Sequence, residues 1–304
     1  MSLHRFAFRA MAADNEVQVH AGDPGAARVA AERAIAEVRR IEAKYSRFRP
    51  DSLLSRINAA AGGDPVAIDA ETESLLDYAH ACWRESGGLF DATSGVLRRA
   101  WDFRVARVPT AMELEPILAL IGWEQVERGG GRVRLPRPGM ELDFGGIGKE
   151  YAVDRALAEL HASGVASGLV NLAGDLAILG PQPGGAAWRI GLRHPRLEGA
   201  LSAWVDVASG ALATSGDYER FIDVDGERHS HLLDPRTGRS AQGFRSVTVH
   251  GPSCLVAGSA ATIAMLKGRG DGPGWLASLG LPSYSILADG SVVDHFRGGE
   301  RRAC

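Results

Sequence analysis

Leu201-Ser-Ala-Trp-Val-Asp-Val207 alternates apolar and polar side chains, and the preceding stretch Trp188-Arg-Ile-Gly-Leu192 does the same. A period of two is typical of strands that have one face buried. Two Asp-Gly pairs, Asp225-Gly226 and Asp289-Gly290, lie between further β-rich runs and indicate hairpin turns. This part of the chain is therefore predicted to be mostly antiparallel sheet.

Four other stretches carry apolar residues at intervals of three or four, the spacing that places one apolar stripe along a helix. They run from Ala26 to Tyr45, from about Glu71 to Ser86, from about Lys149 to Leu160 and from about Cys254 to Lys267, where Gly268 is expected to end the helix. Helices and strands occur in blocks rather than as a regular βαβ series. The fold class is therefore predicted to be α+β, with antiparallel sheets and packed helices.

The chain has 304 residues, enough to bury a large core, and its 45% hydrophobic and 23% charged residues are close to the averages for folded soluble proteins. We expect one domain over residues 1–304, with a disordered polar tail at 297–304. The net charge of -3 and the lack of a sustained basic run argue against nucleic acid as a partner. The three cysteines are too few and too scattered for a disulfide framework or a zinc site.

The sequence also lacks the usual signals of membranes and export. No apolar run reaches the roughly 18 residues of a spanning helix, and the N-terminus has neither the apolar segment of a secretion signal nor a lipid-accepting cysteine. No membrane span is expected. The chain as written is predicted to be cytoplasmic, and periplasmic if a leader has been removed.

A glycine-rich loop, Asp143-Phe-Gly-Gly-Ile-Gly-Lys149, lies between an extended segment and the third predicted helix. Its glycines let the backbone approach a ligand, and the positive end of the helix suits an anion. Lys149 in the first turn opposes the helix dipole, a cost that a bound phosphate or a nearby carboxylate would offset. A glycine-rich turn with a solvated lysine is the alternative.

A second polar cluster, His229-Ser-His-Leu-Leu-Asp-Pro-Arg-Thr-Gly238, contains two imidazoles, a carboxylate and a guanidinium. Either histidine could serve as an acid or base, although such clusters also form turns in which an Asp before Pro bonds its own backbone. Asn171-Leu-Ala-Gly-Asp175 and Thr214-Ser-Gly-Asp-Tyr-Glu-Arg220 suit ligand loops and ordinary turns equally. Phe90-Asp-Ala-Thr93 could equally be a helix cap.

The order of these motifs along the chain resembles the ApbE family, the FAD:protein FMN transferases. The resemblance extends from about Met11 to Val293, and it implies a T-fold-like α+β domain. Each motif is weak alone, and their shared order makes the set specific. Besides the motifs above, it is carried by Met11-Ala-Ala13, Tyr45-Ser-Arg-Phe48, Ser52-Leu-Leu-Ser-Arg-Ile-Asn58, Gly88-Leu-Phe-Asp-Ala-Thr93 and Tyr151-Ala-Val-Asp154.

The resemblance implies a transferase that cleaves the pyrophosphate of FAD with a metal ion, usually Mg²⁺, moves FMN to a threonine of a target flavoprotein and releases AMP. Some relatives mainly hydrolyse FAD. Phe48 stands where an aromatic residue is usual, and from the sequence alone it could equally be a core aromatic. The implied FAD site is lined by Met11, Phe48, Leu89, Phe90, Asp91, Asp143, Lys149 and Leu232.

The residue types suit this chemistry. Breaking a phosphoanhydride needs positive charge on the phosphate oxygens, which Lys149 and a metal could supply. The attacking hydroxyl needs a base, and the resemblance makes His231 the first candidate and Asp217 the second. Lys149, His231 and Asp217 are therefore the expected catalytic residues.

The expected metal site departs from the family pattern. Ala257-Gly-Ser-Ala-Ala-Thr262 aligns with a family run A-D-A-x-x-T, so that Gly258 stands in place of an aspartate that is a metal ligand. The ligands that the resemblance retains are the Thr262 hydroxyl and the backbone carbonyl of Gly146. Two smaller departures are Met11-Ala-Ala13, where the family has M-G-T, and Glu150, where a glycine is common after the lysine. Mg²⁺ is usually held by one or two carboxylates, so its binding is expected to be weak or absent unless another carboxylate replaces the aspartate.

Three functions remain open at this point. The chain could be an FMN transferase or FAD pyrophosphatase in which Asp175 or Asp91 reaches the metal. It could be an FAD-binding protein that has lost the metal and catalysis, or an α+β oxidoreductase subunit without a flavin. We expect FAD to bind and favour the transferase, because the chain retains Asp143, Lys149, His231 and Thr262.

Overall fold

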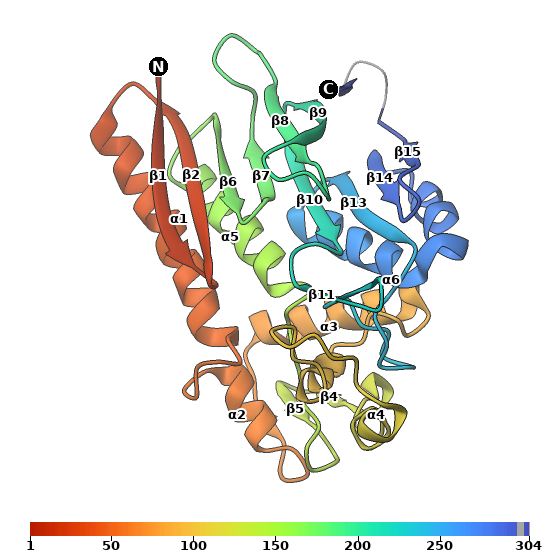
Figure 1. Cartoon of the computed structure of the whole chain (residues 1–304). Coiled ribbons are helices and arrows are strands. Elements are labelled where there is room, and N and C mark those ends of the chain that lie inside the picture. Colours follow the sequence, from red (N-terminus) through yellow and green to blue (C-terminus); the bar gives the residue numbers. More distant parts are fainter. Residues whose placement is uncertain (297–300, 304) are drawn as a thin grey trace.

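The computed structural model describes residues 1–296 and 301–303. Its centre is an eight-stranded sheet (Figure 1) in which every neighbouring pair is antiparallel, as predicted. In spatial order the strands are β1 (Ser2–Ala10), β2 (Ala13–Ala21), β6 (Gly168–Leu172), β7 (Asp175–Leu179), β10 (Gly210–Gly216), β13 (Phe244–Gly251), β14 (Ser283–Leu287) and β15 (Val292–Asp294).

Three helices pack against one face of this sheet: α1 (Pro24–Tyr45), α5 (Gly148–Ala162) and α6 (Cys254–Ser278) (Figure 1). The buried side of α1 is largely alanine, so α5 can pack closely against it. Larger side chains such as Val38 and Ile41 are fully buried there, and each contributes about 1.5–3 kcal/mol of apolar burial. This packing places the first turn of α5 near the centre of the molecule.

The predicted helices are confirmed, with differences at their ends. Helix α1 begins at Pro24 because the Asp23 carboxylate accepts hydrogen bonds from the first free backbone N–H groups. Helix α3 (Ala70–Ser86) ends at Gly87, whose φ of 68° is the expected left-handed cap. Gly268 has a φ of 68° and a ψ of -170°, so α6 consists of two helices that meet at a kink at this residue. The expected end of the first helix at Gly268 is therefore confirmed, and the second helix beyond it was not predicted.

The alternating stretches of the sequence form strands, as predicted, on the other face of the sheet. They are β8 (Trp188–Arg193) and β9 (Leu201–Val207), and their apolar side chains make a second core with those of the central sheet. The predicted tail at 297–304 lies outside the described residues except for β16 (Arg301–Ala303), which pairs with β9.

Shorter elements gather at one end of the molecule (Figure 1). Asp225-Gly226 forms the turn of a hairpin there, with φ values of 51° and 79°, and Asp289-Gly290 connects β14 to β15, so both predicted turns are confirmed. The hairpin of β1 and β2 was not predicted. The elements not yet named are α2 (Leu53–Ala59), β3 (Val66–Ala67), η1 (Ser94–Arg99), α4 (Ala111–Leu118), η2 (Trp123–Gln125), β4 (Glu127–Gly129), β5 (Arg132–Arg134), β11 (Phe221–Val224) and β12 (Glu227–Ser230).

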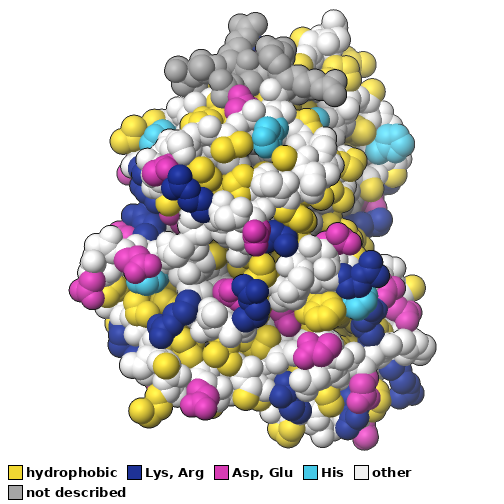
Figure 2. Space-filling view, turned by 90° about the vertical axis from the view of Figure 1, so that its right-hand side faces the viewer, with side chains coloured by type: hydrophobic (Ala, Val, Ile, Leu, Met, Phe, Trp, Pro, Cys, Tyr) yellow, Lys and Arg dark blue, Asp and Glu magenta, His cyan; other side chains and the backbone are white. Residues whose placement is uncertain are grey.

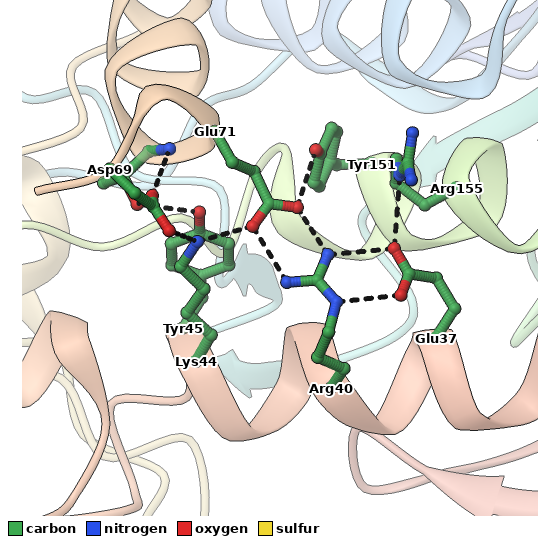
Figure 3. Close-up of polar contacts among 9 residues, drawn as sticks. Glu37, Arg40, Lys44, Tyr45, Asp69, Glu71, Tyr151 and Arg155 are labelled. Carbon is green, nitrogen blue, oxygen red and sulfur yellow. Dashed lines mark hydrogen bonds and ion pairs between the residues drawn. The ribbon is translucent and has the colours of Figure 1, made fainter.

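A network of charged and phenolic side chains connects α1, α3 and α5 (Figure 3). At its centre the Glu71 carboxylate accepts hydrogen bonds from Arg40 and Lys44 of α1 and from the Tyr151 hydroxyl of α5, the last at 2.9 Å. Arg40 and Arg155 also bind Glu37. The network therefore holds the start of α5 in place through Tyr151.

The surface carries charges of both signs. On the face drawn in Figure 2, Lys and Arg side chains are interspersed with Asp and Glu side chains and do not form one basic patch. Within residues 1–296 and 301–303, no helix is both long enough and apolar enough to cross a membrane.

Candidate active site

The glycine-rich loop leads directly into α5. The Asp143 backbone N–H donates to the Ala92 carbonyl at 2.8 Å, and the Asp143 carboxylate accepts from the Gly145 N–H at 2.9 Å. Asp143 also forms an ion pair with Arg47. A Cβ atom added to Gly146 would lie 2.8 Å from the Phe90 ring. Only glycine therefore fits under Phe90, and the loop contacts the segment of Leu89, Phe90 and Asp91, whose side chains are buried.

Lys149 lies at the N-terminal end of α5 and forms an ion pair with Asp175, with 2.6 Å between Nζ and Oδ2. The Asp175 side chain is 4% exposed, and it also accepts the backbone N–H of Thr214 at 3.0 Å. Burial alone would lower the pKa of Lys149, but the negative charges of Asp175 and Glu150 outweigh it and raise that pKa. Lys149 therefore stays charged, and three motifs that are distant in sequence meet at this ion pair.

Glu150 is almost completely buried, at 6% exposure, and its Oε2 atom has no hydrogen-bond partner among the described residues. Burial, followed by the negative charge of Asp175, raises the pKa of Glu150, while Lys149 opposes the shift. A Cβ atom built on Gly258 would lie 2.5 Å from the Glu150 Cγ atom. The departures from the family pattern at Glu150 and Gly258 therefore occupy one space, which the sequence did not indicate.

Helix α6 presents its first turns to this region. Asp154 of α5 accepts the backbone N–H groups of Cys254 and Leu255 at 2.7 and 2.9 Å, which joins the two helices. Thr262 follows Gly258 by one helical turn on the same face. Its hydroxyl is 2.8 Å from the Ser215 hydroxyl of β10.

His231 lies within reach of the electrostatic influence of Lys149 and Arg220. Desolvation of the imidazole ring, followed by these two positive charges, lowers the pKa of His231, although the residue is exposed. A neutral imidazole with an accessible edge can accept a proton. The backbone N–H of His231 donates to the Arg220 carbonyl at 2.9 Å and fixes this segment beside β11.

Asp217, the second candidate base, is held differently. Arg196 donates to both of its carboxylate oxygens, at 2.7 and 2.6 Å. This bidentate ion pair engages both oxygens of Asp217, so neither is left free to contact a substrate hydroxyl. The geometry favours His231 over Asp217 as the base.

Two arginines in the site were not singled out in the sequence. Burial, followed by the positive charges of Arg98 and Arg220, lowers the pKa of Arg47. Cations held near one another in this way favour an anionic ligand, which would relieve their repulsion. Arg47 and Arg220 lie inside the motifs Tyr45–Phe48 and Thr214–Arg220, so the signal was present but was assigned to neighbouring residues.

The remaining predicted FAD-site residues lie at varied depth. Phe48 is 78% exposed and lies against the Arg47 guanidinium, 4.8 Å from ring centre to Cζ, so its interpretation as a core aromatic is wrong. Met11 is half-buried in the β1–β2 turn at a φ of 52°, and its N–H donates to Glu42 at 2.6 Å. Leu232 is half-buried beside His231.

Asp91 binds backbone N–H groups, as the alternative from the sequence expected, but it does not cap a helix, because η1 begins after Thr93 without a side-chain cap bond. Its carboxylate accepts the backbone N–H groups of Thr93 at 2.7 Å and Trp123 at 3.2 Å. Burial raises the pKa of Asp91. With both oxygens used in these bonds, Asp91 is a poor replacement for the missing metal ligand.

The other acids near Gly258 differ in how their oxygens are used. Within the described residues, no three His, Cys, Asp or Glu side chains gather as a metal cluster. Asp154 binds backbone N–H groups of α6, and Asp175 binds Lys149 and Thr214. Of these acids in the described chain, only Glu150 keeps an oxygen without a partner.

Comparisons with known proteins agree with the resemblance drawn from the sequence. The ApbE family profile matches residues 11–284. The FAD:protein FMN transferase of Treponema pallidum is 31% identical, over 92% of this chain and 85% of that protein. The transferase of Rhodobacter capsulatus is 33% identical over 91% of this chain, which spans about half, 54%, of that protein's length.

Solved structures show the same architecture. The ApbE protein of Thermotoga maritima superposes with a TM-score of 0.89 and 31% identity, covering 96% of this chain and 97% of that one. The flavinyl transferase ApbE of Pseudomonas stutzeri gives a TM-score of 0.85 and 30% identity, over 96% and 93% of the two chains. The alternative of an oxidoreductase subunit without a flavin thereby loses its support. The chain belongs to the ApbE family.

Proposed function

We propose that this chain is an FAD:protein FMN transferase, which moves FMN from FAD to a threonine hydroxyl of an acceptor flavoprotein and releases AMP. The observation that carries the proposal is geometric: Asp175 pairs with Lys149 at 2.6 Å and accepts the Thr214 N–H, and the motif that begins at Thr214 ends at Arg220, whose carbonyl accepts the His231 N–H. Relatives of closely similar fold are named for this reaction. The cytoplasmic location expected from the sequence stays a prediction.

The reaction is a phosphoryl-type transfer. The threonine oxygen attacks the phosphorus of the FMN half of FAD, its proton passes to the neutral His231 ring, and the bond to the AMP phosphate breaks. Negative charge builds on the phosphate oxygens in the transition state. Lys149 and the arginines Arg47 and Arg220 supply fixed positive charge there, which stabilises the transition state more than the ground state.

The residues present also fit a divalent cation such as Mg²⁺. The site offers hard oxygen donors, namely the Thr262 hydroxyl, the Gly146 carbonyl and the buried Glu150 carboxylate, and Mg²⁺ takes such donors together with substrate phosphates. When bound, the cation would add positive charge at the pyrophosphate. Exposed Phe48 beside Arg47 offers a flat apolar surface for one of the FAD rings.

The test uses FAD, Mg²⁺ and a panel of flavoproteins that carry an accessible threonine. Transfer is measured as AMP release by chromatography and as covalent FMN on the acceptor by mass. His231→Ala is expected to lower the transfer rate by about 10²–10⁴-fold while FAD still binds, because only the base is lost. His229→Ala, in the same motif as His231, is the matched control. The centre of the His229 ring lies 5.9 Å from that of Trp101, and loss of this ring should change the rate little.

Three outcomes would overturn parts of the proposal. If the His231→Ala variant transfers FMN as fast as the unaltered protein, His231 is not the base. If the unaltered protein binds FAD but releases no AMP with any acceptor, the chain is a flavin-binding protein. Release of AMP and FMN without any covalent product would identify an FAD pyrophosphatase.

A further inference from the structure

The most unusual charged group in the described part of the chain is Glu150. It is only 6% exposed, and one of its carboxylate oxygens lacks a partner. Buried acids are nearly always paired or hydrogen-bonded, because an unmatched charge in the interior is costly. A group that bears this cost without a protein partner is a candidate for binding something that the chain itself does not supply.

The carboxyl group of Glu150 lies at the junction of α5 and α6, and this position limits which ligands can reach it. The carboxyl group lies over Gly258 of α6, where a Cβ atom would be 3.0 Å from Oε1 and 3.1 Å from Cδ. Any side chain at residue 258 would therefore collide with Glu150. The space above Gly258 is filled by the Glu150 side chain, which comes from α5.

The neighbours of Glu150 complete a mixed set of oxygen donors and charges. Asp175 and Asp154 act on it with negative charge and Lys149 with positive charge. The oxygens of Asp154 are used by backbone N–H groups, and those of Asp175 by Thr214 and Lys149. The Thr262 hydroxyl is on the same face of α6 as Gly258, one turn farther along. Glu150 is thus the acid of this group that keeps an oxygen without a protein partner.

We propose that Glu150 supplies, from α5, the carboxylate ligand of a divalent cation at the α5–α6 junction, together with the Thr262 hydroxyl. This inference rests on the proposed function, because the cation would serve the FAD pyrophosphate bound beside Lys149. A single carboxylate with neutral oxygens and phosphate oxygens is a usual set for Mg²⁺. The absence of a side chain at Gly258 is then what makes room for the ligand.

The test measures cation binding directly. Mn²⁺, a spectroscopically visible substitute for Mg²⁺, is titrated into the full chain with and without FAD, and free Mn²⁺ is followed by electron paramagnetic resonance. Glu150→Gln is expected to weaken Mn²⁺ binding by at least about tenfold, a loss that even changes beyond the direct ligands can cause. Glu159→Gln, the same change farther along α5, is the matched control and should leave the binding constant unchanged. FAD binding in the absence of metal, followed by flavin fluorescence, should be the same in all three proteins.

A second variant tests whether weaker Mn²⁺ binding in Glu150→Gln comes from the lost carboxylate or from a disturbed fold. Glu150→Gly combined with Gly258→Asp moves the acid from α5 to α6, and it is expected to restore Mn²⁺ binding to within a few fold. Gly258→Asp alone should fail to tighten binding, because its side chain meets Glu150. Equal Mn²⁺ affinity for Glu150→Gln and the unaltered protein would overturn the inference, as would a double variant that folds but binds no Mn²⁺.

These outcomes separate the inference from the proposed function. Mn²⁺ binding that depends on Glu150, without any AMP release, would retain the cation site and refute the transferase. Metal-dependent AMP release that is identical in Glu150→Gln would retain the transferase and refute the role of Glu150.

Discussion

The first turns of α5 lie between two acidic side chains that differ in their hydrogen-bond partners: Glu71 of α3 on one side and Glu150 of α5 itself on the other. On the side facing α1 and α3, the Glu71 carboxylate has three donors, Arg40, Lys44 and Tyr151 (Figure 3). On the side facing α6, Glu150 is more deeply buried and has one oxygen without a partner. Tyr151, which binds Glu71, directly follows Glu150 in the sequence. The difference therefore arises because these two neighbouring side chains face different helices. The comparison indicates that the first side holds the fold together and the second is arranged for a ligand.

The largest effect on the free energy of unfolding is expected at Lys149, whose positive charge lies near the buried acids Asp175 and Glu150. Lys149→Met leaves Asp175 and Glu150 without their positive neighbour, so it should lower the free energy of unfolding by about 2–4 kcal/mol. Urea denaturation monitored by circular dichroism measures this change. Lys267→Met is the control. It removes a single 3.3 Å hydrogen bond to the Ser86 carbonyl, so it should lower the free energy of unfolding by less than about 1 kcal/mol. Equal losses for the two variants would contradict a special role for Lys149.

A smaller effect is expected in the network of Figure 3. Glu71→Gln should lower the free energy of unfolding by about 1–2 kcal/mol at pH 7, a figure reduced for partial access of water to the 20% exposed side chain. Hydrogen bonds from Arg40, followed by those from Lys44 and Tyr151, lower the pKa of Glu71 from 4.5 to about 2. A lowered pKa means that the charged carboxylate stabilises the folded state above pH 4.5 and loses this effect as the pH falls toward 2.

The difference between Glu71→Gln and the unaltered protein should therefore shrink between pH 5 and pH 3. Unfolding free energies measured across this range decide the point. A difference that stays constant with pH would show that the network acts through packing instead of charge.

The smallest effect on stability is expected for the same change on the other side of α5. Glu150→Gln, in buffer free of divalent metal, should leave the free energy of unfolding within about 0.5 kcal/mol or raise it, because it removes a buried charge that lacks a full set of partners. Denaturation of Glu71→Gln and Glu150→Gln under one set of conditions compares the two sides directly. A loss for Glu150→Gln as large as that for Glu71→Gln would mean that both acids are structural.

Much of the fold could be predicted from local pattern. Alternation in Leu201–Val207, the Asp-Gly turns and the apolar stripe of Ala26–Tyr45 each correspond to an observed element, because burial of one face imposes a period on the sequence. The second helix beyond Gly268 was missed because the glycines and the proline of Arg269-Gly-Asp-Gly-Pro-Gly274 are typical of a loop. The hairpin of β1 and β2 was missed because its turn, Met11-Ala12, uses positive φ at residues that rarely adopt it.

The site was predicted in part. Lys149 pairs with Asp175 and the His231 N–H bonds the Arg220 carbonyl, while the catalytic roles expected for Lys149 and His231 stay predictions. Asp217 and Asp91 have partners that argue against the roles expected for them. Arg47 and Arg220 were not recognised as site residues, because an arginine in a motif has many uses and only its neighbours distinguish them. Phe48 is exposed, which no local pattern around it indicates.

By itself, the sequence determined the α+β class, the main helices, the antiparallel strands and the family, since these depend on periodicity and on the order of motifs along one chain. Only the tertiary structure showed that the departures from the family pattern at Glu150 and Gly258 lie against one another. Glu150 and Gly258 are 108 positions apart in the sequence, and no spacing shows that one side chain fills the space above the other residue. Whether a buried acid is paired or free is a property of contacts between helices, and the packing of α5 on α6 creates those contacts.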